Sequence, residues 1–353
     1  MILESKLISE KLLKWYDHNA RILPWRVFGE AKVDPYKVWI SEIMLQQTTV
    51  NAVIPYFNLF IQKWPTNKIL CKADLSEILN VWSGLGYYSR ARNIHLCSLI
   101  VNKDFNNFFP DTEIDLLKLP GIGSYTAAAI LAIAFNKRAV VIDGNIKRVI
   151  SRLFFLEKPI KENYKQIWKF TDLITPYSRV GDFAQSLMDL GSQICTPVKP
   201  KCDQCPIIKH CQSKNNECEN IIPKKVKKIK KPLRYGSSFI ITKNQKVLIY
   251  KRLDRGLLAG LDSLPSTGWD NQTDKRLNFV KYLKKKKFKR INHQFTHFTL
   301  NMKVYLVDYT LSENSNVELP EDFRWIKIEE IKNLSFSSLM DKIFRTAFND
   351  KNF

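Results

Sequence analysis

The stretch that decides the fold reads Leu116-Leu-Lys-Leu-Pro-Gly-Ile-Gly-Ser-Tyr-Thr-Ala-Ala-Ala-Ile130. It places a glycine turn between an apolar helical segment and an alanine-rich helix, which is a helix–hairpin–helix pattern. Gly121 and Gly123 let the backbone bend so that its amides and the N-terminus of the next helix face one anion, a natural site for a DNA phosphate. A tight helical corner is the plainer alternative, and the basic composition favours the phosphate site.

The composition of the chain points to a polyanionic partner. Its 353 residues, 45% of them hydrophobic, are enough for two or three domains with substantial cores. Lys and Arg number 56 against 34 for Asp and Glu, which gives a formal net charge of +22. A lysine-rich surface kept only for solubility would give the same composition, so the motifs must decide between the two interpretations.

Neither a secretion signal nor a membrane span is expected. The first 15 residues carry five charged side chains among the apolar ones, so they lack the apolar core of a signal peptide. The longest apolar run, residues 127–135, is far shorter than the roughly 18 residues that cross a bilayer. The sequence therefore predicts a soluble protein without a membrane partner.

The chain has two parts with different sequence patterns. Apolar residues recur at intervals of three and four from residue 3 to about residue 190, which indicates many short helices. Residues 223–234 are basic and proline-flanked and are interpreted as a linker. Beyond it, strands are expected at 238–242, 246–250 and 302–308 and a helix at 339–348. The predicted architecture is an all-α domain over 1–222, with the hairpin at 116–130, followed by an α+β domain over 235–350.

Four cysteines are spaced closely enough in the sequence to bind a metal through their thiolates. Cys195, Cys202, Cys205 and Cys211 follow the spacing C-x6-C-x2-C-x5-C, and four thiolates suit either tetrahedral zinc or a [4Fe–4S] cluster. Zinc ribbons usually repeat C-x2-C twice, whereas one such pair occurs here, so the spacing of segment 195–211 favours iron and sulfur. Three further cysteines are interpreted as structural thiols, namely Cys71, Cys97 and Cys218.

Two carboxylates stand out as candidates for acid–base chemistry. Glu42 lies in an apolar helical segment, where burial raises a carboxyl pKa and can keep a general acid protonated near neutral pH. Asp143 ends an apolar run and begins a helix, a position that equally suits an ordinary N-cap. Either acid taken alone fits a structural role at least as well as a catalytic one.

From about residue 23 to residue 298 the chain resembles the adenine DNA glycosylases of the MutY type, within the endonuclease III superfamily of helix–hairpin–helix glycosylases. The pieces that carry the likeness stand in the order of the family. They are Leu-Pro-Trp-Arg at 23–26, Pro-Tyr-Lys-Val-Trp-Ile-Ser-Glu-Ile-Met-Leu-Gln-Gln-Thr at 35–48, Gly-Leu-Gly-Tyr-Tyr-Ser-Arg-Ala-Arg-Asn at 84–93, the hairpin, Val-Ile-Asp-Gly-Asn at 141–145, and the four cysteines.

The resemblance assigns roles to residues of the helical half. It implies that Glu42 protonates the N7 atom of an adenine flipped out of the duplex. Asp143 would then stabilise the positively charged sugar, electrostatically or as a transient covalent partner, before water attacks with Glu42 acting as base. Tyr125 and Asn145 match positions that contact this site and orient Asp143. Two further residues match those that wedge into the base stack beside the lesion, namely Gln47 and Tyr87.

The resemblance also sets expectations for the end of the chain. The C-terminal domain is similar to the family's Nudix-like module, and Phe295, Thr296 and His297 fall where the family reads 8-oxoguanine with Phe-Ser-His. Thr296 departs from the serine but keeps the hydroxyl. The charged Arg-Glu-x-x-Glu-Glu helix of Nudix hydrolases is absent from the sequence between 256 and 287, so this domain is expected to bind and not to hydrolyse.

Together these expectations describe a monofunctional glycosylase, because Tyr125 stands where lyases of the superfamily carry a lysine. The implied substrate is double-stranded DNA with adenine opposite 8-oxoguanine or guanine, whose repair prevents G:C to T:A transversions. The implied cofactor is a [4Fe–4S] cluster, and a cytoplasmic, nucleoid-associated monomer handing its product to other base-excision-repair enzymes is expected. Three alternatives remain: a glycosylase/lyase on oxidised pyrimidines, a non-catalytic iron–sulfur DNA-binding protein and a zinc-stabilised nucleic-acid-binding protein.

Overall fold

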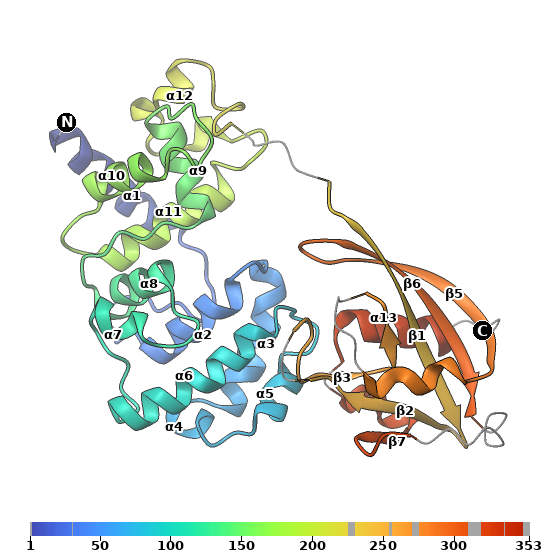
Figure 1. Ribbon diagram of the computed structural model, residues 1–353. Coiled ribbons are helices and arrows are strands. Elements are labelled where there is room, and N and C mark those ends of the chain that lie inside the picture. The colour runs from blue at the N-terminus through green and yellow to red at the C-terminus, as the bar shows by residue number, and fades with distance from the viewer. Residues whose placement is uncertain are drawn as a thin grey trace. The chain divides into compact units, whose positions relative to one another are not determined.

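The computed structural model describes residues 2–29, 31–224, 230–253, 256–269, 275–309, 319–334 and 336–348 (Figure 1). It divides into two compact units, the first comprising residues 1–72 and 93–227 and the second residues 73–92 and 228–353. Helices dominate the first unit, and a sheet with flanking helices makes the second. The predicted fold class, helical and then α+β, is confirmed, whereas the predicted domain boundaries stay predictions. Part of the predicted linker, 225–229, lies outside the described residues.

Short helices joined by short loops fill the chain before residue 228, as the periodicity predicts. In chain order they are α1 (Ile2–Asn19), α2 (Pro35–Leu45), α3 (Val50–Lys63), α4 (Asn67–Leu70), α5 (Leu75–Val81), α6 (Ser89–Phe105), α7 (Glu113–Leu117), α8 (Ser124–Phe135), α9 (Gly144–Leu153), α10 (Tyr164–Ile174), α11 (Val180–Gln193), η1 (Cys202–Gln204), η2 (Ile208–His210) and α12 (Gln212–Asn215). Helix α5 belongs to the second unit, together with the loop that follows it.

Helices α2, α8, α9 and α11 build the framework of the first unit. Helix α2 begins where Asp34 accepts a hydrogen bond from the amide of Tyr36, with proline at the first helical position. Helix α8 is buried along its middle, from Thr126 to Ala132, and packs against α2 and α11. Gly181 permits this approach, because a Cβ atom there would lie 2.7 Å from the carbonyl oxygen of Ala132. Close backbone packing therefore fixes how these helices face one another.

The second unit is built on one mixed sheet. Its strands are β1 (Leu233–Lys243), β2 (Lys246–Lys251), β3 (Asp262–Ser263), β4 (Ser266–Thr267), β5 (Lys285–Gln294), β6 (Thr299–Asp308) and β7 (Phe323–Lys327). The order along the main path is β3-β2-β1-β6-β5, with β4 paired to β1 and β7 to β2. Strands β1 and β6 run parallel, and the other pairs are antiparallel.

Each face of this sheet carries its own core. Helix α13 (Ser338–Phe348) packs its apolar residues against one face, which includes Ile240, Met302 and Val304. The 3₁₀ helix η3 (Lys275–Lys281) packs against the other face, near Phe239 and Val307. A further 3₁₀ helix, η5, spans Ile328–Asn333. Among the described helices, none combines the length and the apolar character that a bilayer crossing requires.

Candidate active site

Glu42 is a buried acid at the centre of the first unit. It lies on α2, its side chain is 5% exposed, and its Oε2 atom accepts a hydrogen bond of 2.7 Å from the hydroxyl of Tyr125 on α8. Burial raises the pKa of Glu42 to about 7, while the Tyr125 hydrogen bond lowers it, the negative charge of Asp143 raises it and the positive charge of Arg26 lowers it. Glu42 therefore holds or releases a proton near neutral pH, as a general acid and base must.

Tyr125 stays protonated beside Glu42. Burial raises the pKa of its phenol well above the usual value, and the negative charges of Glu42 and Asp143 raise it further. The phenol is thus a hydrogen-bond donor throughout the range in which Glu42 titrates. Tyr125 holds the carboxyl group of Glu42 in one orientation.

Asp143 is the N-cap of α9 and is half-buried. Its Oδ1 atom accepts a hydrogen bond of 2.6 Å from the amide of Ile146, and its Oδ2 atom accepts one of 2.9 Å from the side chain of Asn145. Both oxygens are thereby oriented by the first turn of the helix. The structural and the catalytic interpretations of Asp143 are compatible, because the cap itself holds the carboxylate in place.

A chain of hydrogen bonds connects Asp143 to the cysteine segment. Asn145 accepts a bond of 2.9 Å from Arg148, whose guanidinium also donates to the carbonyl oxygens of Gly191 and Cys195, at 2.5 and 2.7 Å. Packing requires glycine at position 191, because a Cβ atom there would lie 2.6 Å from the Cβ atom of Asn145. The position of the cysteine segment is therefore coupled to that of the carboxylate.

The four predicted metal ligands lie together at the end of the first unit. All four are half-buried, and Cys195, Cys205 and Cys211 pack against the core that contains α9 and α11. Burial raises the pKa of Cys205 to about 12, and the charges of the other three thiols raise it as well. The thiols are thus close enough to interact electrostatically.

The surroundings of these thiols fit an iron–sulfur cluster. Arg152, which is 2% exposed, donates from Nη1 to the sulfur of Cys195 at 3.2 Å and to the carbonyl oxygen of Thr196 at 2.7 Å. A cation beside four thiolates offsets part of their negative charge. Within the described ranges, no three His, Cys, Asp or Glu side chains gather around a single metal position. A cluster does not require such a gathering, because each of its irons takes one thiolate.

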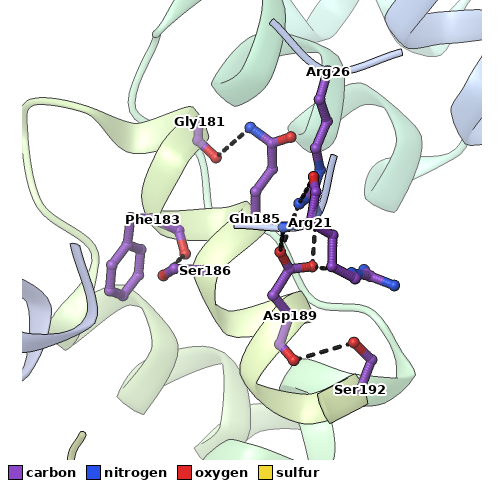
Figure 2. Close-up of polar contacts among 8 residues, drawn as sticks. All are labelled: Arg21, Arg26, Gly181, Phe183, Gln185, Ser186, Asp189 and Ser192. Atoms are coloured by element: carbon purple, nitrogen blue, oxygen red, sulfur yellow. Dashed lines mark hydrogen bonds and ion pairs between the residues drawn. The ribbon is translucent and has the colours of Figure 1, made fainter. Parts of the chain in front are cut away.

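Asp189 on α11 forms a second buried charge centre, which the sequence did not reveal (Figure 2). Its carboxylate is fully buried and accepts hydrogen bonds of 2.6 Å from Arg21 Nε and of 2.6 and 2.9 Å from the two terminal nitrogens of Arg26. The backbone amide of Arg21 also donates to it, at 3.0 Å. Asp189 therefore fixes both arginines. The detectable signal was an acid flanked by Met188 and Leu190 in an amphipathic helix, the same signal that marked Glu42.

The two arginines and Glu42 line one small pocket. It has a volume of about 40 Å³, and its wall also includes apolar side chains, among them Trp25, Leu45 and Val50. Pockets that bind small molecules usually measure roughly 300–1,000 Å³, so this pocket is small for a ligand site. A nucleobase enters it only if the surrounding side chains move apart.

We expect Asp189→Asn to destabilise the first unit strongly, because it leaves two arginines without their buried counter-charge. Breaking a buried pair costs about 3–5 kcal/mol of unfolding free energy. Urea denaturation measures the loss. Asp182→Asn is the matched control, because Asp182 pairs with Arg179 at the surface, where an ion pair contributes at most about 1 kcal/mol. Equal effects of the two substitutions would show that Asp189 is not a buried anchor.

The predicted phosphate hairpin joins α7 to α8. Gly121 has φ +82°, and a Cβ atom there would lie 2.9 Å from the Cβ atom of Asn93, so both the turn and the packing require glycine. Gly121 and Gly123 are exposed, whereas Ile122 between them is buried and anchors the turn. Gly123 is the N-cap of α8 and gives no side-chain cap to the amides of its first turn. Those amides suit an anion.

The two predicted wedge residues share an unusual backbone conformation. Gln47 has φ +58° and Tyr87 has φ +48°, both in the left-handed region that non-glycine residues rarely adopt. Gln47 is exposed just after α2, and Tyr87 is 40% exposed in the loop after α5. Such strain, about 1–3 kcal/mol a residue, persists where the surrounding structure enforces it and often marks a functional position.

In the second unit, the predicted lesion-reading residues form the hairpin between β5 and β6. Phe295 points into the core and stacks on Trp269 and Phe298, with ring centroids 5.7 and 4.7 Å apart. Thr296 and His297 are exposed at the tip. The hydroxyl of Thr296 shares a hydrogen bond of 2.9 Å with that of Tyr87. Phe295 thus anchors the hairpin in the core, and the hydroxyl of Thr296 stays at the surface.

A pocket of about 390 Å³ opens at this hairpin. Its walls come from four segments of the second unit: residues 86–89 with Arg92, residues 256–258, residues 293–298 and residues 337–339. Its volume falls within the range of small-molecule pockets, roughly 300–1,000 Å³. The structure therefore brings Tyr87 and the predicted lesion-reading residues to one concave site.

Comparisons with known proteins agree with both units. The family model of the HhH-GPD superfamily base excision DNA repair proteins matches residues 40–172, the iron–sulfur binding domain of endonuclease III matches 195–211, and the NUDIX domain matches 238–346. The predicted helix–hairpin–helix core, iron–sulfur module and Nudix-like domain are therefore confirmed.

Curated relatives extend over nearly the whole chain. The adenine DNA glycosylase of Buchnera aphidicola subsp. Baizongia pistaciae is 38% identical over 87% of this chain and 88% of its own length. The human adenine DNA glycosylase is 31% identical over 95% of this chain and 72% of its own length. Among solved structures, a thermostable thymine-DNA glycosylase is 30% identical with a TM-score of 0.54, covering 61% of this chain and 98% of that one.

Proposed function

Because the chain belongs to the adenine DNA glycosylases, we propose that its substrate is adenine paired with 8-oxoguanine or guanine in duplex DNA. As a member of that family it is a base-excision-repair enzyme, which hydrolyses the bond between adenine and deoxyribose in DNA. The observation that carries the proposed mechanism is the buried Glu42, whose pKa of about 7 and hydrogen bond from Tyr125 suit a general acid.

The proposed first step is proton transfer from Glu42 to the flipped adenine. Protonation of a ring nitrogen gives the base a positive charge. When the glycosidic bond breaks, the base keeps the electron pair of that bond and therefore leaves as neutral adenine. The small pocket beside Glu42 widens to admit the base, with Arg21 and Arg26 held in its wall by Asp189. Glu42, now ionised, then takes a proton from the water that attacks the sugar.

Asp143 is proposed to stabilise the positive charge that develops on the sugar. The hydrogen bonds from Ile146 and Asn145 orient its carboxylate before the reaction, so little reorganisation is needed when the charge appears. Tyr125 carries a phenol and no amine, so it cannot form the Schiff base that a strand-cutting lyase needs. The proposed enzyme is therefore monofunctional.

The chain binds a [4Fe–4S] cluster through its endonuclease III-type iron–sulfur domain. We assign Cys195, Cys202, Cys205 and Cys211 as its ligands, because their thiols lie together and the matched domain spans them. The cluster supplies a cross-link that fixes segment 195–211. Through Arg148 and Asn145 that segment supports the orientation of Asp143.

Recognition of the opposite base is proposed for the pocket at the β5–β6 hairpin. The oxidised base carries a hydrogen on N7, where guanine has only a lone pair, and the Thr296 hydroxyl can accept from that hydrogen. Its present partner, the Tyr87 hydroxyl, can be exchanged for the base. Such a contact distinguishes the two bases without any catalytic group in the second unit.

Strand-resolved assays of the cluster-loaded protein test the proposal. The substrates are duplexes with one adenine opposite 8-oxoguanine, guanine or thymine, and each strand is scored with and without hot alkali. Alkali-dependent cleavage of the adenine strand opposite 8-oxoguanine and guanine, with none opposite thymine, is the expected result. Cleavage without alkali would contradict the monofunctional assignment, and equal excision opposite thymine would contradict the mispair assignment.

We expect Thr296→Val to reduce the preference for 8-oxoguanine over guanine by about 2- to 10-fold, because one hydrogen bond contributes about 0.5–1.5 kcal/mol. Single-turnover excision rates on the two duplexes give the ratio. Thr296→Ser should retain the preference, because it keeps the hydroxyl. Thr346→Val is the matched control, since that hydroxyl bonds within α13 to Lys342. An unchanged ratio in Thr296→Val would remove this residue from recognition.

A further inference from the structure

The described residues of the second unit cover one face of its sheet only in part. Residues two apart on a strand share a face, and the register aligns Tyr235 of β1 with Asn301 of β6 and Asn292 of β5. It likewise aligns Phe239, Tyr305 and Phe288 on the same face. Helix η3 covers the end of this face near Phe239. We call the remainder the open face, made by Tyr235, Phe288, Arg290, Asn292, Asn301 and Lys303.

Aromatic rings stand exposed on the open face. Tyr235 is 66% exposed and Phe288 is 53% exposed, although the opposite face of the same strands is buried under α13. Figure 1 shows β1, β6 and β5 running side by side as long strands. With strands about 4.8 Å apart and about 3.3 Å a residue, the two rings stand roughly 16 Å apart across the sheet. The open face therefore presents separated aromatic platforms.

Cations surround one of these platforms. Lys303 and Arg290 are exposed, and their charged groups lie 5.8 and 6.0 Å from the centroid of the Phe288 ring. Lys285 lies 5.5 Å from the neighbouring ring of Tyr305. No acidic residue occurs among the residues of the open face. Its charge is complementary to a polyanion.

We propose that the open face binds a DNA strand with unpaired bases. Aromatic side chains interleaved with cations are how proteins hold single strands, because each base stacks on a ring and each phosphate meets a cation. A duplex offers phosphates but hides the faces of its bases, so it would leave the exposed rings of Tyr235 and Phe288 unused. An acidic protein would satisfy the cations alone.

The open face lies beside the hairpin that is proposed to read the opposite base. Gln294 and Thr299 pair at its uncovered end, directly beside the hairpin that carries Thr296. A strand held on the open face therefore lies next to the proposed lesion-reading pocket. Exposed rings, positive charges and strand register define the open face, so binding of DNA there does not depend on the proposed mispair.

Binding of fluorescein-labelled (dT)12 to the full-length, cluster-loaded protein tests the proposal by anisotropy. We expect the Kd to rise about 10-fold or more in Tyr235→Ala/Phe288→Ala, because stacking on each ring contributes substantially to binding. Tyr282→Ala is the matched control, since Tyr282 is 70% exposed and lies outside the three strands. Equal Kd values in the double variant and the control would overturn the proposal.

Two further readouts keep the proposal testable if the double variant folds poorly. Arg290→Gln/Lys303→Gln should reduce the slope of log K against log salt by about 1.4, since each lost phosphate contact on a single strand contributes about 0.7. Photo-crosslinking with 5-iodouracil in the same oligonucleotide should label a peptide containing Tyr235 or Phe288. Crosslinks confined to residues 1–227, or an unchanged salt slope, would show that the open face does not bind the strand.

Discussion

Glu42→Gln is expected to reduce adenine excision by at least about 10³-fold while the protein still binds its duplex. Glutamine keeps the shape of the side chain and its ability to accept from Tyr125, but it has no proton to give to the leaving base. General acid catalysis contributes roughly 10²–10⁴-fold, and Glu42 serves here both as the acid and afterwards as the base. Single-turnover excision with a labelled adenine strand measures the effect.

The same substitution should stabilise the fold, which separates lost chemistry from lost structure. Burial raises the pKa of Glu42 to about 7 from 4.5, so the folded chain binds this proton more tightly than the unfolded chain. The stability of the parent therefore falls as pH rises from about 4.5 through about 7, by up to roughly 3 kcal/mol. At pH 8 Glu42→Gln should exceed the parent by a comparable amount in urea denaturation.

The rate of adenine excision should also fall as pH rises. Excision by the parent should decline as pH rises above about 7, because the acid loses its proton. Glu10→Gln is a control for loss of a carboxylate at the surface, since Glu10 pairs only weakly with Lys6 at 3.9 Å. Unimpaired excision by Glu42→Gln, or by the parent well above pH 7, would show that another group supplies the proton.

Local patterns predicted the elements better than the contacts between them. The apolar neighbours of Glu42 predicted its burial, and the run before Asp143 predicted an N-cap, which the structure shows. The partner of Tyr125 lies 83 residues away, and those of Asp189 lie 163 and 168 residues away. Periodicity carries no information about such pairs, so the buried charge centre at Asp189 stayed hidden.

The second unit shows the same limit in its strands. Strands β1, β2 and β6 were predicted because apolar residues dominate or alternate within them. Strand β5 was not, since its lysine-rich start suggests low complexity and its pairing with β6 supplies the order. Strands β3 and β4 have two residues each, too few for any period to be visible. Tertiary pairing decided these segments.

Asp143→Asn is expected to reduce excision by about 10²–10³-fold while leaving the fold intact. Asparagine is as good an N-cap as aspartate, so it can still accept from the amide of Ile146 and hold the first turn of α9. It carries no negative charge, however, and removal of one preorganised electrostatic partner of a transition state costs a factor of this size. Excision rates at saturating enzyme and urea midpoints measure the two effects separately.

Asp34→Asn is the matched control for this substitution, because Asp34 caps α2 through the amide of Tyr36 in the same way. It should change neither excision nor stability by more than a small factor. If Asp143→Asn behaved like Asp34→Asn in both measurements, Asp143 would be only a cap, and the charge on the sugar would have to be stabilised elsewhere. A loss of excision at unchanged stability assigns the negative charge itself to catalysis, because the cap is retained in both variants.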